Sequence, residues 1–276
     1  MHRDLKSISA QIVRWIMLLY AGFNIAILIY VFYNSLRPRT DFLTNTFGLS
    51  TNLSIGNFIE IIVKDGFFRY CLNSFLILAG SLILSIFLSS TVAYGLGHYK
   101  FKFKRFWKTY FLIGLMFPIQ LSIVPVFLIT KQLNLINTFT SVILIFGSSI
   151  SMSVFLLTNF FANLPKEIYE AAVLDGAGEF RTFVQIMFPM ASPVVFSMSI
   201  LTAVNIWNQF FVPLIFLQSD AKKTIPLLVM KYTKKLLMTI DSAFAVSILA
   251  TVPILILFTI FSSQILEGIA EGGVKG

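Results

Sequence analysis

The sequence predicts an all-α integral membrane protein with six transmembrane helices, and two observations lead to this fold class. The 276 residues are 57% hydrophobic and only 12% charged, with a mean hydropathy of +0.85, so a water-soluble core could not hold all of the apolar side chains. The apolar residues also gather in six stretches without Asp, Glu, Lys, Arg or His, each of about the 20 residues that cross a bilayer core. The stretches are 15–34, 72–97, 110–130, 141–161, 191–217 and 243–265.

The first stretch follows basic residues and resembles a secretory signal peptide in that respect. Its apolar run is longer than a typical signal, and no cleavage site of small residues follows it. We therefore expect a retained span. The chain then divides into an N-terminal segment, residues 1–70, with the first span and an external region, and a five-helix core, residues 71–276.

Six spans put both termini on one side of the membrane. Lys and Arg are almost evenly divided between the two sides, but Lys100, Lys102, Lys104, Arg105 and Lys108 crowd one short loop, and short basic loops favour the cytoplasm. A second group of five lysines, within 222–235, opposes this assignment. We expect cytoplasmic termini, and we attribute the net charge of +9 to contact with anionic lipid rather than nucleic acid.

The spans lack the ionisable groups that ion-coupled transporters and voltage sensors usually carry. The chain also has no G-x-x-x-x-G-K-[ST] sequence that would bind ATP phosphates, so energy for uphill transport has to come from a partner. Cys71 is the only cysteine, and with His2 and His98 in terminal or loop positions no catalytic or metal site is expected. We interpret these three residues as incidental.

The most informative segment lies between the fourth and fifth spans, at about 162–190. Pro165 is tolerated at a first helical turn, Glu167 and Glu170 lie near the positive end of the helix, and the run through Leu174 contains good helix formers. The pattern predicts a short, water-facing helix between two apolar spans. The alternative is a plain connector with two helical turns.

Small residues continue this segment. Ala171 and Ala172 have almost no side chain, so another protein could approach the backbone closely there. Gly176 and Gly178 predict a sharp reversal that a side chain would hinder. A second short helix then leads to Pro189 and the next span.

The spacing resembles the EAA loop of bacterial ABC importer permeases: Glu-Ala-Ala, three residues, Gly, nine residues, Ile, one residue, Leu-Pro. In this chain Glu170 to Ala172, Gly176, Ile186 and Pro189 match. Phe188 replaces the usual Leu and keeps the position apolar.

The resemblance is strongest to the carbohydrate-type permeases, the group of the maltose importer's smaller membrane subunit, and covers nearly all of the chain after residue 70. Individually weak matches occur in the family's order at Asn73-Ser74, 93–96, 117–120, Val124-Pro125, 135–138, Trp207-Asn208, 213–216 and 271–276.

This resemblance implies a type I importer in the bacterial cytoplasmic membrane, with two permease chains, two ATPase subunits and an extracytoplasmic sugar-binding protein. ATP and Mg²⁺ would be bound by the ATPase subunits, and this chain would bind no cofactor and would not be an enzyme. The residues implied in ATPase coupling are Glu167, Glu170, Ala171, Ala172, Asp175, Gly176, Gly178, Ile186 and Pro189. The tail would reach the ATPase dimer interface through Gly272, Gly273, Val274, Lys275 and Gly276.

Neutral polar residues at membrane depth are candidates for a substrate pathway, because they need hydrogen-bonding partners there. They are Gln120, Asn205, Asn208 and Gln209. The alternative is that they bind neighbouring helices. Trp207 could stack on a sugar ring, although an aromatic side chain within a bundle more often packs.

We therefore expect a permease subunit for a sugar, in particular an oligosaccharide. The alternatives are an ABC permease for another solute such as glycerol phosphate, which predicts a cationic pathway residue, and a secondary transporter that works alone. The 222–235 lysines could face an acidic rim on the binding protein, although a solvated surface is the default. The high Phe, Ile and Lys content indicates an AT-rich, low-GC bacterial genome.

Overall fold

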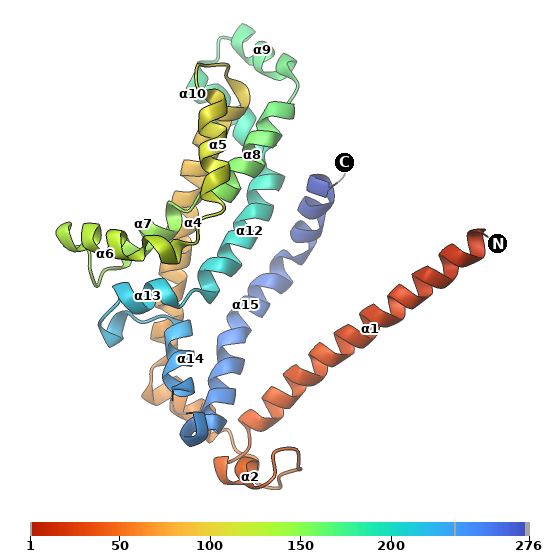
Figure 1. Cartoon of the computed structure of the whole chain (residues 1–276), viewed down its shortest axis with the longest axis vertical. Helices are drawn as coiled ribbons and strands as arrows, with labels where there is room; N and C mark the ends of the chain where they lie inside the picture. Colours follow the sequence, from red (N-terminus) through yellow and green to blue (C-terminus); the bar gives the residue numbers. More distant parts are fainter. Residues whose placement is uncertain (1, 235, 274–276) are drawn as a thin grey trace. The chain divides into compact units, whose positions relative to one another are not determined.

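The computed structural model describes residues 2–234 and 236–273, and every regular element in those ranges is a helix (Figure 1). The chain forms two compact units. Unit 1 contains Met1–Phe68 and Leu228–Pro253, and unit 2 contains Arg69–Leu227 and Ile254–Gly276.

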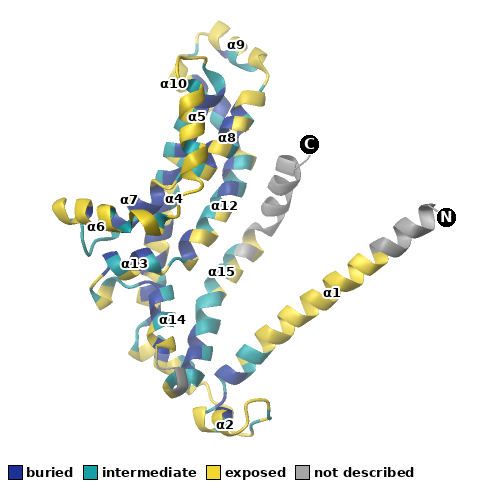
Figure 2. Cartoon of the chain, in the orientation of Figure 1, coloured by how far each residue is buried: buried dark blue, intermediate teal, exposed yellow. Residues whose placement is uncertain are grey.

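Unit 1 begins with the long helix α1, His2–Ser35, whose side chains are exposed along most of its described length (Figure 2). None of the most apolar stretch within Gln11–Ser35 is buried in the chain. Its hydrophobic side chains therefore require lipid or another protein around them. Short helices follow: α2, Arg39–Thr44; α3, Gly56–Ile59; and a π-helical turn, Glu60–Lys64. The unit also contains the first part of α15, Leu236–Gly273, which is kinked at Thr239.

Arg37 organises the segment after α1. Its guanidinium, in a side chain only 2% exposed, donates hydrogen bonds to Asn34 Oδ1 (2.9 Å), the Asp41 carbonyl (2.9 Å) and the Asn45 carbonyl (2.8 Å). Ser50 adds a second tie, because its amide donates to the Tyr33 hydroxyl at 2.6 Å. A buried cation is stable here because neutral oxygens surround it.

Unit 2 contains the remaining helices, and most of them are short. They are α4, Phe67–His98, from Arg69 on; α5, Lys104–Gly114; a 3-10 turn, Ile119–Ser122; α6, Ile123–Gln132; α7, Phe139–Gly147; α8, Ser151–Asn163; α9, Lys166–Leu174; α10, Glu179–Thr182; a π-helical turn, Phe183–Met187; α11, Phe188–Met190; α12, Ser192–Asn208; α13, Phe211–Phe216; and a 3-10 turn, Asp220–Lys222. The helix α14, Ile225–Thr233, begins in unit 2 and continues into unit 1 from Leu228 on.

Three helices of the described chain are continuous and apolar enough to cross a membrane: Gln11–Ser35, Phe67–His98 and Met238–Leu257. Three further candidates are bent pairs, 104–114 with 119–132 (96°), 139–147 with 151–163 (42°), and 179–190 with 192–208 (72°). If each pair is one span, six spans result, at the expected positions in the sequence.

The third, fourth and fifth spans are bent. The third breaks before Pro118, and the bend of the fifth pair lies between Pro189 and Pro193, because proline removes a backbone donor and clashes with the preceding turn. The expected 191–217 span ends at Asn208, and α13 is a separate helix.

The core of unit 2 lies where α4, α8 and α12 meet. It contains Ala93, Tyr94, Leu157, Phe161, Met187, Ala191, Val195 and Met198. Gly97 allows the close approach of α4 and α8, because a Cβ there would lie 3.0 Å from the Thr158 carbonyl oxygen. Small residues at such contacts are typical of membrane helices.

Removing the Arg37 guanidinium is expected to loosen the segment after α1. In Arg37→Met, the buried oxygens lose their donors at a cost of about 3 kcal/mol, so the amides of Ser50 and Ser54 should exchange hydrogen about two orders of magnitude faster. Hydrogen exchange of the purified protein measures this. Arg69→Met, at an exposed arginine, is the control, and equal exchange rates in both variants would contradict the role of Arg37.

Candidate functional site

The 164–178 loop of unit 2 forms a helix with a tight C-terminal turn. Pro165 is the N-cap residue of α9. At the other end the amide of Gly176 donates to the Val173 carbonyl and the amide of Ala177 to the Ala172 carbonyl, both at 3.0 Å. This hydrogen-bond pair is a Schellman motif, in which the residue after the C-cap is left-handed.

The two glycines of the loop have different roles. Gly176 has φ of +76° and therefore supplies the reversal that the sequence predicts. Gly178 has φ of −73° and ψ of 162°, an extended conformation open to any residue, and it is the N-cap residue of α10. The prediction that Gly178 also needs to be glycine for the turn is wrong.

The exposed surface of the loop is largely apolar at its tip. Leu174 is 87% exposed and Phe180 is 80% exposed. Of the two alanines, Ala171 is exposed but Ala172 is only 4% exposed, so the predicted alanine patch consists of Ala171 alone. The other predicted coupling residues Glu167, Glu170, Asp175 and Pro189 are exposed, and Ile186 is half-buried.

A carboxylate joins this loop to the end of α4. Glu179 Oε1 accepts a hydrogen bond from the Tyr169 hydroxyl at 2.5 Å, and Oε2 accepts one from the Tyr99 hydroxyl. Sequence reasoning missed all three residues. Their separations of 10 and 80 positions follow no local period, so only the fold brings them together.

His98 belongs to the same cluster. Its ring stacks on Tyr94, with centroids 5.3 Å apart and planes 3° from parallel, and lies 4.2 Å from the Tyr169 ring centroid. His98 therefore has a packing role in this cluster, which the sequence did not predict. Lys104 secures the end of α4, because its Nζ donates to the carbonyls of Gly97 (3.2 Å) and Tyr99 (2.8 Å).

The hydrogen bond to Glu179 raises the pKa of Tyr169 to about 12, with a smaller contribution from burial. Burial, followed by the hydrogen bond to Glu179, raises the pKa of Tyr99 as well. Both hydroxyls therefore stay protonated and remain donors at neutral pH.

A cavity of about 350 Å³, lined by apolar as well as polar side chains, lies between α8, α12 and the 119–122 turn; we call it the polar cavity after its amide and hydroxyl groups. Gln120, Asn205 and Gln209 from the predicted pathway line it, together with Ser149, Ser153 and Thr202. Neutral hydrogen-bond donors and acceptors thus line one cavity. The amide nitrogen of Asn205 donates to the Leu201 carbonyl at 3.0 Å.

Two predicted pathway residues do not line this cavity. Trp207 is 4% exposed and its ring packs edge-on against Phe75, with centroids 5.3 Å apart. Asn208 is exposed and its amide donates to the Val204 carbonyl at 2.9 Å. The packing interpretation of Trp207 therefore fits its place in unit 2.

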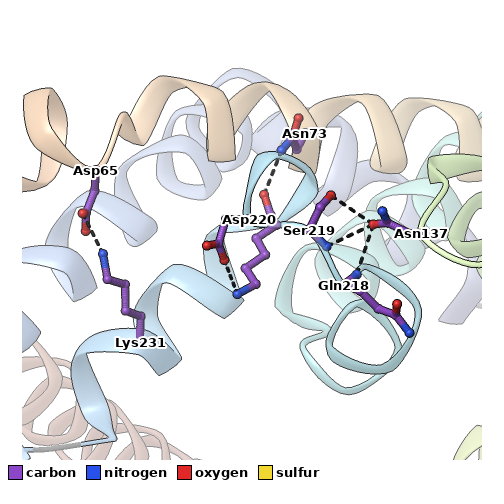
Figure 3. A network of polar contacts seen from close by, with 8 residues as sticks. Asp65, Asn73, Asn137, Gln218, Ser219, Asp220 and Lys231 are labelled. Carbon is purple, nitrogen blue, oxygen red and sulfur yellow. Dashed lines mark hydrogen bonds and ion pairs between the residues drawn. The ribbon is translucent and has the colours of Figure 1, made fainter.

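The segment after α13 is tied to two distant parts of unit 2 (Figure 3). Asn137 Oδ1 accepts hydrogen bonds from the amides of Gln218 and Ser219, both at 3.1 Å. The Asn73 amide donates to the carbonyls of Ala221 and Lys223, both at 2.9 Å.

Three of the lysines expected to face a partner have acceptors within the chain. Lys222 donates to the Asn137 carbonyl, and Lys223 pairs with Asp220 at 2.5 Å. Within unit 1, Lys231 pairs with Asp65 at 2.7 Å (Figure 3). Lys235 lies outside the described residues.

The predicted C-terminal contact with the ATPase subunits lies at the end of the described residues. Gly272 and Gly273 are the last residues of α15. Val274, Lys275 and Gly276 lie outside the described residues.

Comparison with known proteins shows the family to which the chain belongs. Residues 85–268 match the family described as "Binding-protein-dependent transport system inner membrane component". The chain belongs to this family. It is therefore a multi-pass membrane component of an ABC importer, and it works with other components of such a system.

Two relatives cover nearly the whole chain. The arabinooligosaccharides transport system permease protein AraQ of Halalkalibacterium halodurans is 33% identical over an alignment of 280 positions, which covers 99% of this chain and 100% of that protein. The diacetylchitobiose uptake system permease protein NgcG of Streptomyces coelicolor is 29% identical over 266 residues, 95% of this chain and 88% of that protein.

The fold is also found in a solved structure. A chain from the crystal structure of a bacterial ABC transporter involved in the import of the acidic polysaccharide alginate has a TM-score of 0.76 at 19% identity, over 91% of this chain and 95% of that one. The predicted all-α fold of a type I importer permease is confirmed.

The left-handed conformation of Gly176 predicts that alanine has different effects at the two glycines of the loop. Gly176→Ala is expected to destabilise the end of α9 by about 1 kcal/mol, because a non-glycine residue is strained at positive φ. Gly178→Ala should leave the end of α9 unchanged, since its extended backbone is open to alanine and a Cβ there meets no atom within 4 Å. Hydrogen exchange of the Ala177 amide distinguishes the variants, and equal rates would contradict this account of the turn.

Proposed function

We propose that this chain is a permease subunit of an ABC importer that brings a sugar, in particular an oligosaccharide, into the cytoplasm. It would pair with a second permease chain, with both termini in the cytoplasm of a bacterial cell. Two ATPase subunits would bind and hydrolyse Mg·ATP, and an extracytoplasmic binding protein would deliver the sugar. The names of the AraQ and NgcG relatives support this substrate class.

The observation that carries the proposal is the apolar tip of the 164–190 loop. Leu174 and Phe180 are more than three-quarters exposed, although the loop itself is fixed by the Schellman turn and by Glu179. A rigid loop with an uncovered apolar tip is suited to insertion into a cleft of another protein. An ATPase subunit fits this need, because the chain has no ATP-binding sequence of its own.

The polar cavity supports the choice of a neutral, hydroxyl-rich solute. Its amide and hydroxyl side chains can both donate and accept hydrogen bonds, and no charged side chain lines it in the described part of the chain. A pathway for glycerol phosphate would favour a cationic residue. Asn205, Gln120 and Gln209 are the residues that we propose contact the sugar.

Co-purification tests the ATPase contact. From native membranes in mild detergent, the wild-type chain should retain an ATPase subunit and a second permease. Leu174→Asp should reduce the bound ATPase at least about tenfold, because burying a Leu side chain contributes roughly 1.5–3 kcal/mol. Leu49→Asp, at an equally exposed leucine after α1, is the control. ATPase retained equally by Leu174→Asp would contradict the proposed contact.

Measurement of sugar uptake tests whether the polar cavity contacts the substrate. Asn205→Leu should reduce sugar uptake by about tenfold if its amide hydrogen-bonds substrate, since one hydrogen bond to a neutral group contributes about 1 kcal/mol and the leucine adds bulk. Asn24→Leu is a matched control, because Asn24 also donates to the carbonyl four residues earlier, at 2.7 Å, on exposed α1. Unchanged uptake in Asn205→Leu would return this residue to a packing role.

A further inference from the structure

We infer that Glu179 is a positioning residue that transmits movement of α9 to α4, by holding both to one carboxylate. This inference rests on the proposed function, because it assumes that an ATPase moves the loop. It assigns a mechanical role to three side chains outside the EAA spacing: Glu179, Tyr169 and Tyr99.

The carboxylate of Glu179 lies between two tyrosines. Each oxygen of Glu179 accepts from a different tyrosine, Oε1 from Tyr169 on α9 and Oε2 from Tyr99 just after α4. Glu179 itself is the first residue of α10. One side chain therefore connects three elements, and hydrogen bonds to an ionised acceptor are stronger than those between neutral groups.

Further contacts fix the end of α4 to which Tyr99 is attached. Lys104 Nζ binds the carbonyls of Gly97 and Tyr99, so the residue that carries the Tyr99 hydroxyl is fixed to the last turn of α4. His98 fills the space between Tyr94 and Tyr169 with ring contacts on both sides. A displacement of Tyr169 is thus passed to α4 through two routes, a hydrogen-bonded one and a packed one.

Few side chains of α9 are buried against the rest of unit 2. Among its described residues only Ala172 is buried, whereas Tyr94 and Phe161 lie in the core of unit 2. Without the carboxylate, α9 would keep the ring contact of Tyr169 with His98 but would lose both hydrogen bonds. The bridge therefore strengthens the connection between the loop and the end of α4.

The test uses the assembled complex, so that loss of assembly is seen separately. Cys71→Ser removes the native thiol, and Ser149→Cys places a reporter in the polar cavity, where Ser149 is exposed. The rate of labelling by a membrane-impermeant maleimide is measured in detergent with and without Mg·ATP and vanadate. The wild-type bridge should give a rate that changes on nucleotide addition.

The bridge variants should uncouple this response. In Glu179→Leu the nucleotide-dependent change in labelling rate should fall at least about tenfold, because both charge-assisted hydrogen bonds are lost and one alone accounts for that factor, while the ATPase remains bound and hydrolyses ATP. Tyr169→Phe and Tyr99→Phe, which remove only a hydroxyl, should each act in the same direction. Neither should add to Glu179→Leu, because the shared acceptor is already absent.

Two controls distinguish transmission from general stability. Glu179→Gln keeps a side chain that can hydrogen-bond both tyrosines and should retain more of the response than Glu179→Leu. Tyr110→Phe makes the same chemical change at an exposed tyrosine of α5 and should leave the response unchanged.

The outcomes separate this inference from the proposed function. A complete complex in which all bridge variants respond to nucleotide like the wild type would overturn the inference and leave the proposed function standing. If the wild-type chain retains no ATPase, the proposed function fails and the inference falls with it. Should Glu179→Leu fail to insert, the two phenylalanine variants decide the result.

Discussion

The absence of water in the bilayer core is the constraint on which the rest of this structure depends. Backbone groups must be satisfied within the segment that carries them, so the spans are helices, and charged side chains are confined to their ends. Where the helices break, at Pro118 and between Pro189 and Pro193, polar side chains become necessary. The cavity lined by Gln120 and Asn205 is formed in part by residues of two of these bent pairs.

The same constraint explains which features the sequence could predict. The positions of the spans follow from composition alone, and the turn at Gly176 follows from local chemistry, because a helix end often needs a left-handed residue. The bends of 96° and 72° were not predictable, since proline indicates where a helix breaks but packing sets the angle. Gly178 was misinterpreted because an extended glycine and a left-handed one look alike in sequence.

The cluster around Glu179 shows the other limit. Tyr99, Tyr169 and Glu179 meet only after α4, α9 and α10 are in place, so a motif such as the EAA spacing finds the loop but not the side chains that fix it. The loop surface and its attachment therefore have different sequence requirements. The tip needs exposed apolar side chains such as Leu174, and the attachment needs a carboxylate between two phenols.

The proposed function requires that energy for uptake reach this chain from an ATPase partner through the loop. Reconstitution of the chain with its co-purified partners into proteoliposomes tests this dependence most directly. We predict that uptake of an oligosaccharide, added with the binding protein outside, requires Mg·ATP inside and stops with vanadate. Uptake by this chain alone, without ATP and without the other components, would contradict the account.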